Sequence, residues 1–251
     1  MKREPLFNIP TVVLVLIGIF TVIQVLRADV LDAFDRNYLD ELFAFIPLRY
    51  DGSRLADGAL PGGVGAEIWS FVTYAFIHGS WTHLFVNSIW FLPFGSAVAR
   101  RFGTARFLAF FAVTAAAGAL AYLFAHGGED SAVIGASAAI SGTMAGAMRF
   151  AFQRGGPLGF WRGSDEAAYR VPALPLSGVW RDPRVVVFLV VWFGINFLFG
   201  ATSLPLTGGD QPVAWQAHIG GFLAGLLLFG WFDPVRTRAD AAVTSEDRPR
   251  G

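Results

Sequence analysis

The chain has 251 residues, a formal net charge of zero, and 15% charged against 54% hydrophobic residues. Soluble domains carry about 25% charged residues, so this composition and a mean hydropathy of +0.51 indicate a membrane protein. The absence of cysteine excludes disulfides and thiol chemistry. No basic cluster is dense enough to predict a nucleic-acid partner.

Six apolar segments follow one another along the chain, and most approach the roughly 20 residues that a helix needs to cross a bilayer. They cover residues 9–26, 81–99, 107–124, 133–152, 185–204 and 213–232. Because the apolar runs are continuous rather than alternating, they favour helices over a closed barrel. The sequence therefore predicts an all-α integral membrane protein, with a bundle of six transmembrane helices over residues 9–232.

Basic residues predict the orientation of the bundle, because Lys and Arg resist transfer across the membrane. With the N-terminus inside, every Lys and Arg outside the first loop faces the cytoplasm. The first loop, at about residues 27–80, holds the exceptions but is net acidic, which suits an external face. We therefore expect a multi-pass protein of the cell (inner) membrane, with residues 1–8 and a disordered tail at residues 233–251 both cytoplasmic.

The first loop is too long for a simple connection, so we expect it to have its own structure or a function. It ends at His78-Gly79-Ser80, where Ser80 can cap a helix that begins at Trp81. This start places His83 in the first turn and Asn87 one turn deeper on the same face. For His78, which precedes the cap, a solvated loop position and a supporting role both stay open.

Three polar residues lie near the outer ends of three helices that run in the same direction: His83, Ser137 and His218. Each lies within about 10 Å of its helix end. Ionisable side chains at such positions in a membrane are rarely without function.

Small residues offer a way for the helices of Ser137 and His218 to pack closely, since they let backbones approach each other. The stripe on the later helix carries His218, Gly221 and Gly225, and the matching face carries Ser137, Ser141 and Ala145, with Gly142 and Gly146 beside it. The expected packing residues are Gly135, Gly142, Gly221 and Gly225. Ordinary small-residue packing without a function is the alternative.

The chemistry that such a pair supports is nucleophilic acyl transfer, because neutral imidazole can take the proton of an attacking hydroxyl. Ser137 at a helix N-terminus also lies beside unpaired N–H groups that favour a developing oxyanion. His83 and Asn87 can add side-chain donors. The helices of Ser137 and His218 contain no carboxylate placed to orient the imidazole, which indicates a dyad rather than a triad.

These residues together resemble the rhomboid family of intramembrane serine proteases. The Gly-x-Ser-x motif of the family is similar to Gly135-Ala136-Ser137-Ala138, and its Ala-His-x-x-Gly-x-x-x-Gly motif is matched by residues 217–225. The family's His-x-x-x-Asn motif is similar to His83 and Asn87, with His78 before it. The resemblance covers about residues 9–232.

The resemblance implies a serine endopeptidase with Ser137 as nucleophile, His218 as base, and His83 and Asn87 in the oxyanion hole. Its expected partners are membrane lipid and single-pass transmembrane substrates, cut near the external face. No cofactor or metal is expected, and no feature predicts an oligomeric state. A catalytically silent rhomboid-like protein that binds transmembrane clients is the alternative.

A metal enzyme is a further alternative, with His78, His83 and His218 as ligands. Neither an HExxH motif nor a nearby carboxylate supports it, and it leaves the Ser137 motif unexplained.

The chain departs from the family pattern at three positions. Ala138 replaces the glycine that usually follows the serine, and Ser70 follows Trp69 where many members have arginine. Ser141 occupies the position of an aromatic residue found one turn below the serine, so we expect different packing to hold the histidine. Asn196, in the fifth apolar segment, is expected to bond another helix, with a substrate contact as the alternative.

Overall fold

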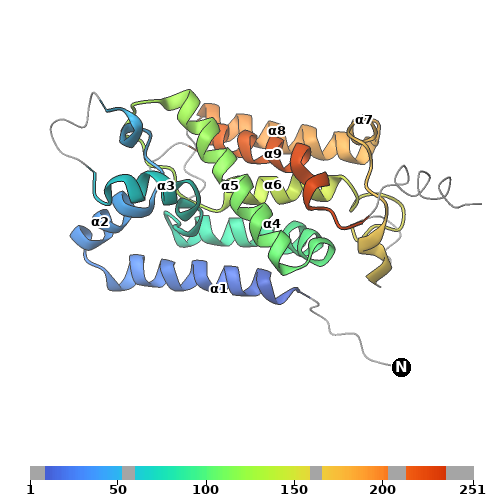
Figure 1. The fold of residues 1–251 in the computed structure, drawn as a ribbon, viewed down its shortest axis with the longest axis horizontal. Coiled ribbons are helices and arrows are strands. Elements are labelled where there is room, and N and C mark those ends of the chain that lie inside the picture. The colour runs from blue at the N-terminus through green and yellow to red at the C-terminus, as the bar shows by residue number, and fades with distance from the viewer. Residues whose placement is uncertain (1–8, 53–59, 159–165, 203–212, 236–251) are drawn as a thin grey trace, which may run out of the picture.

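The computed structural model describes residues 9–52, 60–158, 166–202 and 213–235 (Figure 1). The predicted all-α class is confirmed, and each of the six apolar segments contains a helix. These helices are α1 (Thr11–Val25), α4 (Trp81–Phe102), α5 (Thr104–His126), α6 (Ser137–Met148), α8 (Pro183–Thr202) and α9 (Trp215–Phe232). Shorter helices lie in the first loop and before α8.

Three helices of the described chain are long and apolar enough to cross a membrane: α1 with its π-helical extension to Val30, α5 and α9. The longest apolar stretch of α8, Pro183–Leu198, is shorter, and α4 carries His83, Asn87 and two arginines among its apolar residues. Length and composition thus support a membrane protein, while the count of six spans stays a prediction.

Helix α6 is shorter than the predicted segment at residues 133–152, because the chain before it is extended. Val133 forms an antiparallel bridge with Phe45. Gly135 donates its N–H to the carbonyl of Tyr74, at 3.0 Å, and has a φ of 110°. This left-handed backbone favours glycine and delays the helix until Ser137.

Helix α6 lies in the middle of the bundle, in contact with α4, α5 and α9 (Figure 1). Every residue of α6 after Ser137 is buried. Helix α1 packs against α4, and α8 packs against α9. Because its neighbours surround it, α6 has no need of a full membrane-spanning length of about 20 residues.

The first loop has its own structure, as its length predicted. It contains η1 (Leu26–Val30), α2 (Ala33–Phe43), η2 (Pro47–Tyr50), α3 (Gly63–Thr73) and η4 (Tyr74–Phe76). The predicted cap is also confirmed: α4 begins at Trp81, and the Ser80 hydroxyl accepts the N–H of His83 at 3.1 Å.

Two buried arginines hold distant segments of the first loop together. Arg27 binds both carboxylate oxygens of Asp40, at 2.7 and 2.5 Å, and donates to the carbonyl of His78 at 2.9 Å. Arg49 donates to the carbonyls of Pro61, at 2.8 Å, and Glu41. The loop is therefore held by charge-assisted hydrogen bonds as well as by apolar packing.

Helices α6 and α9 make backbone contact at two glycines. A Cβ atom at Gly221 would overlap the carbonyl of Ala138, and one at Gly225 would overlap the backbone of Gly142. The missing side chain of Gly142 faces Thr114 of α5 instead. The contact line on α6 thus runs along Ala138 and Gly142, one residue beyond the predicted face of Ser137, Ser141 and Ala145.

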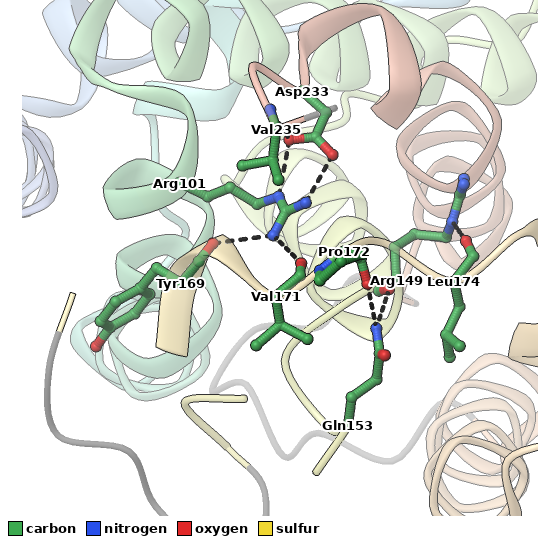
Figure 2. Close-up of polar contacts among 9 residues, drawn as sticks. All are labelled: Arg101, Arg149, Gln153, Tyr169, Val171, Pro172, Leu174, Asp233 and Val235. Carbon is green, nitrogen blue, oxygen red and sulfur yellow. Dashed lines mark hydrogen bonds and ion pairs between the residues drawn. The ribbon is translucent and has the colours of Figure 1, made fainter. Parts of the chain in front are cut away.

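A buried ion pair joins the C-terminal ends of α4 and α9 (Figure 2). Arg101, at the end of α4, binds both carboxylate oxygens of Asp233 just after α9, each at 2.8 Å. Its remaining nitrogen donates to the carbonyls of Tyr169 and Val171. Side-chain exposure is 0% for Arg101 and 4% for Asp233. The predicted tail began at residue 233, but Asp233 belongs to the bundle; residues 236–251 lie outside the described chain.

The glycine contact can be tested on α9 itself. Gly225→Ala places a methyl group against the backbone of Gly142, and overpacking of this kind costs about 1–3 kcal/mol. We expect a lower midpoint of thermal unfolding in detergent. Gly230→Ala is the matched control, because nothing lies within 4 Å of a Cβ atom there. Equal effects of the two substitutions would contradict the close contact.

The ion pair gives a second stability prediction. Asp233→Ala leaves the buried guanidinium of Arg101 without its carboxylate, which should cost about 3–5 kcal/mol of unfolding free energy. Combining Arg101→Met with Asp233→Leu should recover most of the loss, because neither charge of the pair then stays buried without its partner. Arg106→Gln, at an exposed position of α5, is the control. If Asp233→Ala unfolded at the same denaturant concentration as wild type, the ion pair would not stabilise the fold.

Candidate functional site

The first turns of α4, α6 and α9 meet at one end of the bundle and bring three predicted residues together. His83 lies in the first turn of α4, Ser137 begins α6, and His218 lies in the first turn of α9. All three residues are partly exposed, whereas the helix interiors around them are buried. The three residues therefore form one polar layer at this end of the bundle.

Ser137 and His218 form a hydrogen bond, with 2.7 Å between the serine Oγ and the imidazole Nε2. The two residues are 81 positions apart in the chain. The glycine contact between α6 and α9 lies directly below them, starting at Ala138 and Gly221. This pair has the geometry of a hydroxyl nucleophile and a base, which requires about 2.6–3.2 Å between heavy atoms.

The other imidazole nitrogen of His218 bonds Asn196 of α8, with 2.5 Å between Nδ1 and Oδ1. The Asn196 side chain also donates its Nδ2 to the carbonyl of Trp192, at 2.8 Å. The prediction that Asn196 bonds another helix is confirmed, but its histidine partner was missed. A usable signal was its position near the C-terminal end of α8, which puts the amide at the level of the α9 start.

His83 and Asn87 lie on the other side of the extended segment before α6. A Cβ atom at Gly135 would lie 2.6 Å from the His83 ring and 3.5 Å from the Asn87 Nδ2. The absence of a side chain there lets α4 approach the chain two residues before Ser137. Among the described residues, the buried Nδ2 of Asn87 has no hydrogen-bond partner. An unpartnered buried donor beside a nucleophile is available to a substrate oxygen.

His78 is fully buried, so the solvated alternative is wrong. Its ring packs against Phe20 and meets the His83 ring edge-on, with 5.2 Å between centroids. Burial lowers the pKa of His78 to about 3, so the ring is neutral at physiological pH. The ring of His78 contacts the site through its edge-on packing against the ring of His83.

The geometry gives little support to a metal centre. Both ring nitrogens of His218 are engaged, one with Ser137 and one with Asn196. Within the described parts of the chain, no three His, Cys, Asp or Glu residues group as metal ligands.

Comparison with known proteins agrees with the sequence motifs. The family model described as "Rhomboid domain" matches residues 65–233. The chain belongs to the rhomboid family. Similar proteins include "Rhomboid protease GlpG" of Yersinia pestis (strain Pestoides F) and of Yersinia pseudotuberculosis (serotype O:3, strain YPIII). Each is 26% identical over 166 residues, which cover 66% of this chain and 48% of the relative. The chain thus spans about half the length of these relatives.

Within this rhomboid domain, the methyl group of Ala138 points away from the serine. It lies over Gly118 of α5, where a Cβ atom would overlap it, and it is 1% exposed. The extra methyl group therefore fills the contact between α6 and α5 rather than the space beside Ser137.

The serines at the other two positions where the chain departs from the family pattern, Ser70 and Ser141, are also buried and hydrogen-bonded. The Ser70 hydroxyl lies 3.0 Å from the hydroxyl of Tyr50. The Ser141 hydroxyl donates to the carbonyl of Ser137 at 2.7 Å. Neither side chain contacts His218 through these bonds, so the imidazole is held by Asn196 and Ser137.

Proposed function

We propose that this rhomboid domain is an intramembrane serine endopeptidase that uses Ser137 as nucleophile and His218 as general base. The observation that carries the proposal is the 2.7 Å hydrogen bond between the Ser137 Oγ and the His218 Nε2. It occurs in an apolar helix bundle, where polar side chains are costly unless they are paired or functional. The rhomboid proteases among its relatives support the same activity.

The reaction begins with attack of the Ser137 Oγ on a peptide carbonyl carbon, as the hydroxyl proton passes to His218 Nε2. The tetrahedral intermediate collapses when the C–N bond breaks and the imidazolium gives this proton to the leaving amine. An ester joins the new carboxyl end of the substrate to Ser137. Water then attacks the ester, with His218 again taking and returning a proton, and the serine is released.

The negative charge of the intermediate requires donors on the side of Ser137 opposite His218. Asn87 supplies a buried Nδ2 without a partner in the described chain, and His83 lies beside it. The first N–H groups of α6 lack a side-chain cap, because the cap residue is Ala136. These groups together form the proposed oxyanion hole.

The proposed substrates are single-pass transmembrane helices, which reach the site from the surrounding lipid. An intact helix keeps its carbonyls in internal hydrogen bonds, so the cleaved segment must unwind near the end of the bundle that holds Ser137. We place this end at the external face of the inner membrane, with both chain termini in the cytoplasm. The buried Arg101 then lies on the cytoplasmic side, in accord with the positive-inside rule.

The proposed nucleophile can be tested with purified protein and a model transmembrane substrate. Ser137→Ala should lower cleavage to background, because no other hydroxyl is bonded to His218 in the described chain. Ser141→Ala is the matched control, since this serine lies one turn deeper on α6 and bonds only a backbone carbonyl. A fluorophosphonate should label wild type and Ser141→Ala but neither Ser137→Ala nor His218→Ala.

Other outcomes would separate the remaining alternatives. Equal cleavage by wild type and Ser137→Ala would contradict the serine mechanism. Loss of cleavage on addition of a chelator would support the metal-enzyme alternative. A wild-type protein that binds the substrate helix, cleaves nothing and takes no label would fit the silent client-binding protein.

The oxyanion hole gives a separate prediction. Asn87→Leu removes the unpartnered amide while keeping a side chain of similar size, and should lower kcat by about 100- to 1000-fold with little change in KM. Ser88→Ala, at the next position of α4, removes a hydroxyl that bonds the carbonyl of Leu84 and should leave kcat unchanged. Steady-state cleavage rates in detergent would measure both. A wild-type kcat in Asn87→Leu would show that this residue does not contribute to the oxyanion hole.

A further inference from the structure

We propose that Asn196 is a positioning residue that holds His218 in the tautomer able to accept the Ser137 proton. The inference rests on the proposed function and extends the serine–histidine pair to a third residue on a third helix. The contacts that carry it are the 2.5 Å bond between Asn196 Oδ1 and His218 Nδ1 and the 2.8 Å bond from Asn196 Nδ2 to the Trp192 carbonyl.

The orientation of the amide follows from its partner on α8. The carbonyl of Trp192 can only accept a hydrogen bond, so the NH₂ group of Asn196 must face it. The Oδ1 atom then faces His218, and because this oxygen can only accept, the proton of the neutral imidazole must lie on Nδ1.

The orientation of the amide thereby determines the protonation state of the opposite nitrogen of the His218 ring. With the proton on Nδ1, the Nε2 of His218 carries a lone pair, and it lies 2.7 Å from the Ser137 hydroxyl. The hydroxyl must then donate to the imidazole, which is the direction that activates the serine. The opposite tautomer would present an N–H group to Ser137 and could not take its proton.

An amide suits this position better than a carboxylate would in a membrane. Asn196 is 7% exposed, and a charged side chain buried there would be costly until the imidazole became protonated. A neutral amide oxygen still accepts from imidazolium, in a charge-assisted hydrogen bond. Asparagine has the corresponding place in the Cys-His-Asn sites of papain-like proteases.

A purely structural role for Asn196 is the competing interpretation, in which its bond only ties α8 to α9. The two helices also meet through apolar contact, since the rings of Trp192 and Phe222 stack with 4.6 Å between centroids. Both rings are buried. The two helices therefore pack against each other without help from the amide. Removal of the amide should change the tautomer of His218 more than the stability of the fold.

Kinetics of substrate cleavage provide the first test. Asn196→Leu should lower kcat by about 10- to 100-fold, the cost of losing a hydrogen bond to a charged group, and leave KM close to wild type. Asn196→Asp should have a kcat about tenfold higher than that of the leucine variant, because a protonated carboxyl can bond both Trp192 and His218. Phe197→Leu, at the next and largely exposed position of α8, is the control and should match wild type.

The second test reads the tautomer directly and does not require activity. In ¹⁵N-histidine-labelled protein in micelles, the His218 signals, assigned by their loss in His218→Gln, should report a protonated Nδ1 in wild type. Asn196→Leu should lose this tautomer preference, with thermal unfolding unchanged.

A fall in kcat with an unchanged tautomer, or an unchanged kcat, would overturn the positioning role. A tautomer that depends on Asn196 in a protein that cleaves nothing would support the contact while the proposed protease function fails.

Discussion

The site depends on one contact, the backbone approach of α9 to α6 at Gly221 and Gly225. Any side chain at these positions would push the helices apart, and the hydrogen bond between Ser137 and His218 tolerates only a few tenths of an ångström. In a membrane, helices associate through close packing and polar contacts rather than the hydrophobic effect. The glycines therefore permit this close packing and also set the distance on which the proposed chemistry depends.

Polar groups occur at both ends of the helix bundle and differ in how they are paired. At one end, partly exposed side chains lie at the first turns of α4, α6 and α9. At the other end, the guanidinium of Arg101 is enclosed by the carboxylate of Asp233 and two backbone carbonyls. A fully paired ion resists separation of the helices, whereas an accessible polar layer can exchange partners with a substrate. The bundle thus has a closed, fully paired polar cluster at one end and a partly exposed polar layer at the other.

The sequence was informative where a local pattern determines the structure. The cap at Ser80 set the start of α4, and with it the positions of His83 and Asn87. Contacts between distant segments were harder to predict: the position of Asn196 along α8 indicates its depth, but not that its side chain faces His218. The α6 face that meets the α9 glycines was also off by one residue, because a rotation of the helix by one position leaves the periodicity of small residues unchanged.

The late start of α6 is the feature that turns a packed helix into a possible oxyanion site. Had α6 begun at Val133, as the apolar run predicted, the N–H of Ser137 would donate to the Val133 carbonyl four residues earlier. That carbonyl instead accepts the N–H of Phe45, at 3.1 Å, and Ser137 becomes the first residue of the helix. First-turn N–H groups have no acceptor within their own helix. The bridge to the first loop therefore leaves the backbone donors beside Ser137 available to a substrate oxygen.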